Sequence, residues 1–379
     1  NGSFRISARL LNTADGSVLW AGETSDLPAS NMLFLQDEIA RTVSGGLRER
    51  TGKPVEYIRQ TDNLDAYQNY LKGRYYWNLR TIESLNKSLE FYERAVALDA
   101  RFSLAYSGMA DSYQLLAEYR GMKTSEAFAR ARLAALKAVE LDESSAEAHN
   151  TLAYILAFYD WEWKPAEQEF LRAIELNPNY ATAHQWYSEL LTTLGRWEEA
   201  EREIKIAHEC DPLSLVIQID IASVYYMTRR FDQTIEQVNR VLETDPKWVW
   251  GYIYLWVTYE QKGMDAESAA AWANAVEFGW GGKDAEELRA AYAAGGRKAF
   301  WTKYLEQSNN PEEANHHLAW DRILCYLRLE DHDKTFEWLE RSYKDRDRWI
   351  MNVRLDPQFD SIRQDPRYPE FVRRIGLEP

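Results

Sequence analysis

The sequence predicts a mainly α-helical protein built from stacked helix pairs, with a small α/β piece at its N-terminus. Gly (18) and Pro (11) are scarce among the 379 residues, so few helix breakers are present. An apolar helical pattern recurs and ends three times at an Asn-Pro or Asp-Pro step, at 177–178, 211–212 and 245–246, with a spacing of 34 residues. Because one helix pair cannot bury its apolar stripe alone, such repetition favours a solenoid.

Composition and charge exclude several functional classes. Apolar residues make up 45% of the chain, which is typical of a folded protein. The 60 acidic and 45 basic residues give a net charge of -15, so nucleic-acid binding through this segment is disfavoured. The longest apolar stretches, 152–159 and 249–257, are far shorter than the ~18 residues that a membrane span needs. Cys210 and Cys325 are too few for a disulfide framework and are interpreted as ordinary buried thiols.

Residues 1–50 are expected to form a partial α/β domain, followed by a linker over 51–64. Apolar and polar residues alternate from Phe4 to Leu10, and Asp15-Gly16 precedes a second strand pattern over 18–24, which predicts a hairpin. Apolar residues at four-residue steps predict an amphipathic helix over about 30–49. One hairpin and one helix are marginal alone. The first residues also show no signal-peptide pattern, and we expect the chain to be the C-terminal part of a longer protein.

Six repeat units are expected over residues 65–278. Small residues recur in two columns at the repeat spacing, with one longer step that places a loop insertion near 119–125. The first column is Ala95, Ala138, Ala173, Ala207, Val241 and Ala275, and the second is Ser88, Ala131, Ala166, Ala200, Thr234 and Ser268. A generic antiparallel bundle would explain the helices but not this register. Trp256 departs from the pattern because it occupies a place where a small residue is usual.

The period becomes irregular after residue 278. Two shorter helical patterns over about 284–294 and 297–307 predict an irregular helical pair within 279–310. A degenerate repeat is expected over 311–346. The segment 347–379 is interpreted as a cap over the last hydrophobic edge, which a solenoid requires for solubility.

The period and its columns resemble the tetratricopeptide repeat (TPR) superfamily, which implies a right-handed superhelix of helix pairs. The sequence also resembles bacterial signalling proteins that carry a TolB-like N-terminal domain before a TPR region. The end of the TolB-like domain is resembled by residues 9–20 and 35–40, the junction into the repeats by 70–78, and the terminal segment by 356–368. The resemblance covers nearly the whole chain. It implies a sensor or interaction module that follows an effector: a CadC/ToxR-type winged helix, a class III nucleotide cyclase or a protein kinase. Family members with a membrane span before this region place it in the periplasm, which we favour over the cytoplasm.

No motif for catalysis, phosphate binding or dinucleotide binding occurs, so we expect no enzyme, no cofactor and no catalytic residues. His316 and His317 would point about 100° apart on a helix, which is poor metal geometry. Asp331 and Asp333 flank His332 at a helix start, where capping is a better interpretation than a cation site. The glycines at 279–282 are interpreted as a helix-ending loop rather than a phosphate cradle. We therefore predict no metal site.

His149 and His184 fall at nearly the same point of successive repeats. A shared ligand surface is one interpretation, and packing or groove lining is the more common role for such residues.

The TPR resemblance implies that the first helices of the repeats line a concave groove. We predict a noncatalytic module that binds an extended peptide or helix there through aromatic anchors. The basic and Asn pairs with which some TPR proteins clamp a terminal carboxylate are absent, so a neutral or basic, partly apolar partner is expected. The alternative is a small-molecule sensor that relays ligand binding to the effector. A homodimer is also considered. The predicted partner-binding residues are Asn150, Tyr154, Phe158, Gln185, Glu189, Tyr226, Trp250 and Ile253.

Overall fold

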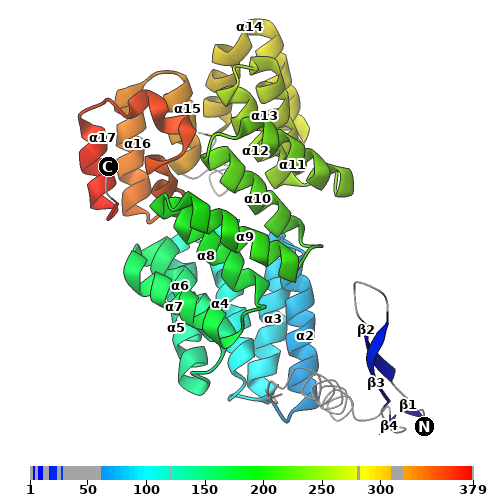
Figure 1. Ribbon diagram of the computed structural model, residues 1–379. Coiled ribbons are helices and arrows are strands. Elements are labelled where there is room, and N and C mark those ends of the chain that lie inside the picture. The colour runs from blue at the N-terminus through cyan, green and yellow to red at the C-terminus, as the bar shows by residue number, and fades with distance from the viewer. Residues whose placement is uncertain are drawn as a thin grey trace.

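The computed structural model describes residues 3–4, 7–11, 17–23, 27–28, 61–119, 121–279, 282–308 and 319–377. Between residues 64 and 279 the described chain forms six successive helix pairs that stack into a curved solenoid (Figure 1). The pairs are α2 (Leu64–Asn78) with α3 (Ile82–Leu98), α4 (Ser103–Glu118) with α5 (Thr124–Leu141), α6 (Ala146–Ile155) with α7 (Trp163–Leu176), α8 (Ala181–Leu194) with α9 (Trp197–Cys210), α10 (Leu215–Met227) with α11 (Phe231–Thr244), and α12 (Val249–Gln261) with α13 (Asp265–Gly279). The predicted fold class, a mainly α solenoid of stacked helix pairs, is confirmed.

The two small-residue columns lie where neighbouring helices meet. All six members of the first column are fully buried, and in the second column Ser268, at 6% exposure, is the most accessible. Small side chains at these positions let the helix axes approach closely, because a larger group would overpack the contact. The Asn-Pro and Asp-Pro steps lie between repeats, where Asn177, Asp211 and Asp245 are the C-cap residues of α7, α9 and α11.

In each of four successive repeats, a side chain near the start of the first helix donates a hydrogen bond to the backbone carbonyl six residues earlier. His149 Nε2 donates to the Glu143 carbonyl (2.9 Å) and His184 Nε2 to the Pro178 carbonyl (3.0 Å). The next two repeats use different residue types for the same bond: Gln218 Nε2 to Pro212 (3.0 Å) and the Tyr252 hydroxyl to Pro246 (2.9 Å). The equivalence of His149 and His184 in the sequence therefore reflects a recurring bond that fixes each inter-repeat loop.

The regular array is interrupted twice. α6 continues into a π-helical turn, η1 (Leu156–Asp160), which ends at Trp161 with a left-handed backbone (φ 62°). After α13, the helix α14 (Gly282–Ser308) is broken by non-helical backbone at Gly295 and Gly296, the latter with φ 64°. This break falls between the two short helical patterns in the sequence, and glycine adopts a positive φ at little cost.

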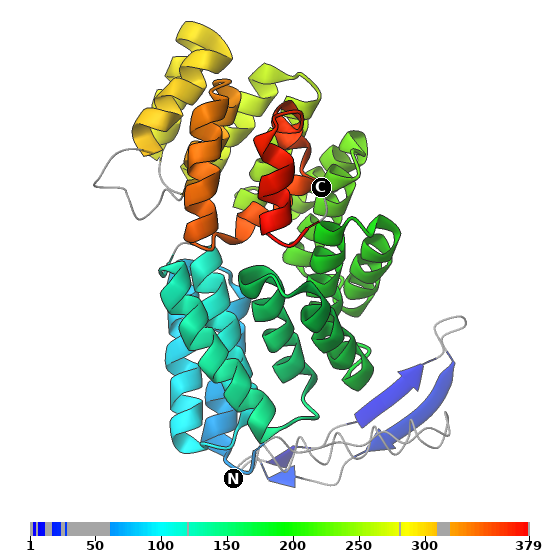
Figure 2. The same cartoon turned by 90° about the vertical axis from the view of Figure 1, so that its left-hand side faces the viewer.

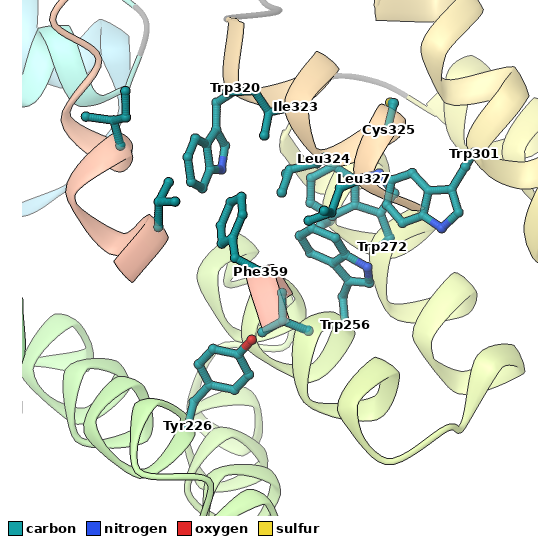
Figure 3. Close-up of a cluster of buried hydrophobic side chains, with 14 of the residues drawn as sticks. Tyr226, Trp256, Trp272, Trp301, Trp320, Ile323, Leu324, Cys325, Leu327 and Phe359 are labelled. Atoms are coloured by element: carbon teal, nitrogen blue, oxygen red, sulfur yellow. The ribbon is translucent and has the colours of Figure 1, made fainter. Parts of the chain in front are cut away.

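Trp256 of α12 is accommodated by a tryptophan cluster. Its ring centroid lies 4.2 Å from that of Trp272 on α13 and 5.7 Å from that of Trp301 on α14. The guanidinium of Arg328 lies 4.8 Å from the Trp256 centroid and donates two hydrogen bonds to Glu260 (3.0 and 2.5 Å). Figure 3 shows these indoles facing the apolar side chains of α15 (Ala319–Arg328). The large residue thus joins the last regular repeat to the helices that follow it.

The C-terminal elements turn back toward the middle of the solenoid. α16 (His332–Lys344) is followed by the 3-10 helices η3 (Arg348–Arg354) and η4 (Pro357–Ile362) and by α17 (Arg367–Arg374). α17 packs beside α16 (Figure 2), where Arg374 bonds to Glu340. η3 and η4 contact α8, η1 and α12 of the earlier repeats. We call residues 348–362 the C-terminal bridge.

The described N-terminal residues form short antiparallel strands. β2 (Ser7–Leu11) pairs with β3 (Val18–Glu23), with Leu10 opposite Trp20, so the predicted hairpin is confirmed. β1 (Ser3–Phe4) pairs with β4 (Leu27–Pro28). The helix predicted over 30–49 lies outside the described residues.

Candidate functional site: a cavity on the concave face

A cavity of about 640 Å³ lies on the concave face of the solenoid. The first helices of the repeats, chiefly α4, α8, α10 and α12, supply one side, and the C-terminal bridge supplies the other. Its lining combines aromatic and aliphatic side chains with carboxylates and a few basic groups. A volume of this size is within the range of ligand sites in proteins, about 300–1,000 Å³.

Arg348 holds the bridge against the repeats by ion pairs. Its side chain is only 7% exposed and pairs with Glu118 of α4 and Glu189 of α8. Its Nη1 also donates to the Tyr154 hydroxyl (2.8 Å), which in turn donates to Glu118 (3.0 Å). Burial raises the pKa of Glu189, although Arg348 opposes this shift. The arrangement satisfies most polar groups of a buried guanidinium, which is the condition under which such a charge is tolerated.

Apolar burial fixes the rest of the bridge. Ile350, Val353, Phe359 and Ile362 are fully buried. In Figure 3 the Phe359 ring reaches toward Trp320, and their centroids are 5.4 Å apart. Burying each such side chain contributes about 1.5–3 kcal/mol. The bridge is therefore part of the folded core and not a loosely docked tail.

A second set of polar bonds joins the bridge to the fifth repeat. The Tyr226 hydroxyl, on α10, donates to Asp356 (2.9 Å). The Arg229 guanidinium donates to both Asp360 oxygens (2.8 and 2.7 Å). Burial raises the pKa of Asp356, and its hydrogen bonds oppose the shift. These bonds join residues more than 120 positions apart in the sequence. They attach the C-terminal bridge to the fifth repeat across the concave face.

Three aromatic rings from distant segments meet at the cavity. Trp250 of α12 donates from its indole nitrogen to the Tyr119 hydroxyl (3.3 Å), with ring centroids 6.0 Å apart. The Trp250 ring also lies 5.6 Å, centroid to centroid, from Trp349 of the bridge. All three line the cavity. They offer ring faces for apolar or cationic groups.

Asp220 of α10 is a further carboxyl group that lines the cavity. It accepts a hydrogen bond from Gln185 Nε2 (2.7 Å) and forms no ion pair within the described parts of the chain. Its surroundings raise its pKa to about 8, first because burial disfavours the charged form and next because the Glu189 carboxylate is near. Asp220 lines the cavity beside Glu189. A cation entering the cavity would favour its charged form.

The structure brings together six of the eight side chains predicted from the sequence. Tyr154, Gln185, Glu189, Tyr226, Trp250 and Ile253 all line the cavity. Tyr154 and Tyr226 are nevertheless almost fully buried, at 1% and 2% exposure, because they support the bridge. Substituting Tyr226 would therefore disturb folding as well as any binding.

Asn150 and Phe158 lie away from the cavity surface. Both are fully buried. Phe158 belongs to the π-helical turn and packs on Tyr154, with centroids 4.6 Å apart, beneath the Arg348 guanidinium at 5.1 Å. Neither side-chain atom of the Asn150 amide has a partner among the described residues. A ligand in the cavity would not reach these two residues.

The sequence interpretation omitted Tyr119, Asp220, Arg348 and Trp349 from the site. Asp220 lies on α10, the first helix of its repeat, and the sequence already predicted that the first helices line the groove. Arg348 and Trp349 follow the last helix pair, where no periodicity indicates contact with the repeats.

The described residues contain no cluster of three or more His, Cys, Asp or Glu side chains that could hold a metal ion. Asp331 caps α16 by accepting from the Lys334 amide (3.0 Å), as predicted. His316 and His317 lie outside the described residues, as does part of the glycine loop at 279–282. Among the helices that the structure describes, none combines the length and apolar character needed to cross a membrane.

Comparison with known proteins supports the repeat assignment. Residues 169–202 match the model of the tetratricopeptide repeat family. Such repeats typically act as noncatalytic scaffolds that bind other proteins. The chain is 26% identical over 211 residues to the transcriptional regulator HilA of Salmonella typhimurium and to that of Salmonella typhi. The alignment covers 55% of this chain and 37% of the regulator, so the chain spans little more than a third of that relative's length.

The comparison with solved structures found, among others, the following two proteins. The yeast Tom70 structure is 15% identical and gives a TM-score of 0.45, with 91% of this chain and 78% of that chain covered. The thermophilic TPR protein TTC0263 of Thermus thermophilus is 19% identical and gives a TM-score of 0.41, with 50% and 96% covered.

Proposed function

We propose that this chain is a noncatalytic interaction module of a bacterial regulatory protein, and that it binds a short segment of a partner protein in the concave cavity. The observation that carries the proposal is the cavity itself, which is lined by the first helices of the repeats and by aromatic side chains suited to anchoring a partner. Because the C-terminal bridge covers part of the concave face, the remaining space favours a short segment over a long peptide.

The regulatory context rests on two supports. One is the likeness to a transcriptional regulator over 211 residues. The other is the resemblance of the N-terminal and junction residues to TolB-like proteins whose effectors precede this region. In this proposal, binding in the cavity is relayed to an effector domain encoded elsewhere in the protein.

A second candidate function is the sensing of a small molecule. It is favoured by the volume of the cavity, which would also enclose a metabolite. Native mass spectrometry of the purified chain tests it, because an added mass that disappears when the cavity is filled by mutation would identify a small ligand.

Selection from a displayed library of random heptapeptides tests the main proposal. Ile253→Trp places a bulky ring in the cavity lining, whereas Leu171→Trp makes a matched change on the exposed surface of α7, where Leu171 is 47% exposed. We expect selected peptides to bind the wild type and Leu171→Trp equally and Ile253→Trp at least tenfold more weakly. Equal binding to all three proteins would refute the assignment of the cavity, and melting temperatures would verify that both variants fold.

A further inference from the structure

We propose that the group anchored in the cavity is a cationic side chain, lysine or arginine, of the bound protein segment, and that Asp220 receives it beside the rings of Tyr119, Trp250 and Trp349. This inference rests on the proposed function of a segment-binding cavity and names the chemistry of its ligand.

The chain's own Arg348 shows how this surface receives a cation. Its guanidinium pairs with Glu118 and Glu189 and lies 5.1 Å from the Phe158 centroid and 4.8 Å from the Trp349 centroid. Carboxylates and ring faces together form the usual environment of a buried guanidinium. The concave surface thus already binds one cation, the Arg348 guanidinium, through carboxylates and aromatic rings, and groups of both kinds also line the cavity.

Asp220 offers the same combination to a second cation. It extends the series of carboxylates from Glu118 on α4 and Glu189 on α8 to the next repeat, on α10. Glu118 and Glu189 are both ion-paired with Arg348, whereas Asp220 has only the Gln185 amide.

The other cations at the cavity leave Asp220 uncompensated. Arg80 and Lys247 also line the space. The Arg80 guanidinium stacks 3.7 Å from the Trp77 ring centroid, and neither group is ion-paired with Asp220 within the described residues. A lysine or arginine from a partner would stabilise the charged form of Asp220 by pairing with it.

Fluorescence anisotropy with two labelled, capped peptides tests the inference. The peptides are Ala-Ala-Arg-Trp-Ala, which imitates the Arg348-Trp349 pair, and the same peptide with citrulline, which keeps the shape of arginine and removes its charge. We expect the arginine peptide to bind the wild type at least tenfold more tightly than the citrulline peptide. Asp220→Asn should reduce that difference to less than threefold. Asp232→Asn, at a side chain that is 88% exposed on α11, is the matched control and should retain the difference.

Three outcomes would overturn the inference. If both peptides bind the wild type equally and Ile253→Trp weakens both, the cavity binds segments without a cationic anchor, and the proposed function stands. If neither peptide binds, the selected heptapeptides decide between two conclusions. Peptides that lack lysine and arginine but lose binding in Ile253→Trp would overturn the cationic anchor alone. If Ile253→Trp weakens the binding of no selected peptide, the proposed function is refuted as well. If n-butylguanidine binds as tightly as the arginine peptide, the cation comes from a small molecule and not from a protein segment.

Discussion

Replacing Arg348 by methionine should destabilise the whole solenoid and not only its C-terminal end. Methionine keeps much of the aliphatic packing, but it leaves Glu118 and Glu189 without their cation. Arg348 is 7% exposed, and the two carboxylates are 13% and 35% exposed. Removing one partner of a buried ion pair costs about 3–5 kcal/mol, and the exposure of Glu189 places the expected loss near the lower end.

The assay is equilibrium unfolding in urea followed by tryptophan fluorescence. A loss of about 3 kcal/mol with a slope of about 3 kcal/mol per molar urea lowers the midpoint by about 1 M. Arg373→Met, at an exposed residue of α17, is the matched control and should stay within about 0.5 kcal/mol of the wild type. Adding Glu118→Gln and Glu189→Gln to Arg348→Met should recover part of the loss, because the unpaired charges are then removed. A midpoint for Arg348→Met equal to that of Arg373→Met would refute the role given to the bridge.

Three further substitutions test the packing and the hydrogen bonds of the repeats. Ala207→Trp overpacks a fully buried column position, so we expect a loss of about 1–3 kcal/mol and a lower melting temperature; unchanged melting would contradict the register. Trp256→Ala empties the space between two other indoles and beneath Arg328, with an expected loss of about 3–5 kcal/mol in urea unfolding, and a loss under 1 kcal/mol would contradict the cluster. His149 donates hydrogen bonds to Glu169 (2.5 Å) and to a backbone carbonyl, and the bond to Glu169 raises the pKa of His149 in the folded protein. The contribution of this charged histidine to stability is therefore complete below about pH 6.5, its unfolded pKa, and declines as the pH rises through the higher folded pKa. The stability difference between the wild type and His149→Gln should therefore be larger at pH 6 than at pH 8.5, and a pH-independent difference would argue against a charged His149.

The regular part of the fold could be predicted because its signals are local and repeated. The Asn-Pro and Asp-Pro steps mark the junctions, and small residues such as Ala173 and Ala207 mark the helix contacts, since each repeat faces the same steric problem. The correspondence of His149 and His184 likewise reflected a bond that four repeats share. Periodicity therefore predicted the helix pairs and much of the concave lining.

The closure of the concave face could not be predicted in the same way. Arg348 contacts Glu189 across 159 residues of sequence, and no periodic pattern links the two. In the sequence an arginine after the last helix pair is indistinguishable from a solvated surface charge. The burial of Phe158 depends on a single π-helical turn, which adds a residue to the helix and which the apolar spacing did not indicate.

The C-terminal bridge also decides how the molecule bears a mechanical load. In an open solenoid each repeat touches only its neighbours, so a pull on the last helix peels the pairs away one after another. Here Arg348 is tied to α4 and α8, and Arg229 of the fifth repeat is tied to Asp360. Tension applied through α17 therefore reaches the second and fourth repeats directly and loads these ties in parallel. The repeats can therefore separate under tension only after the contacts of the C-terminal bridge have broken.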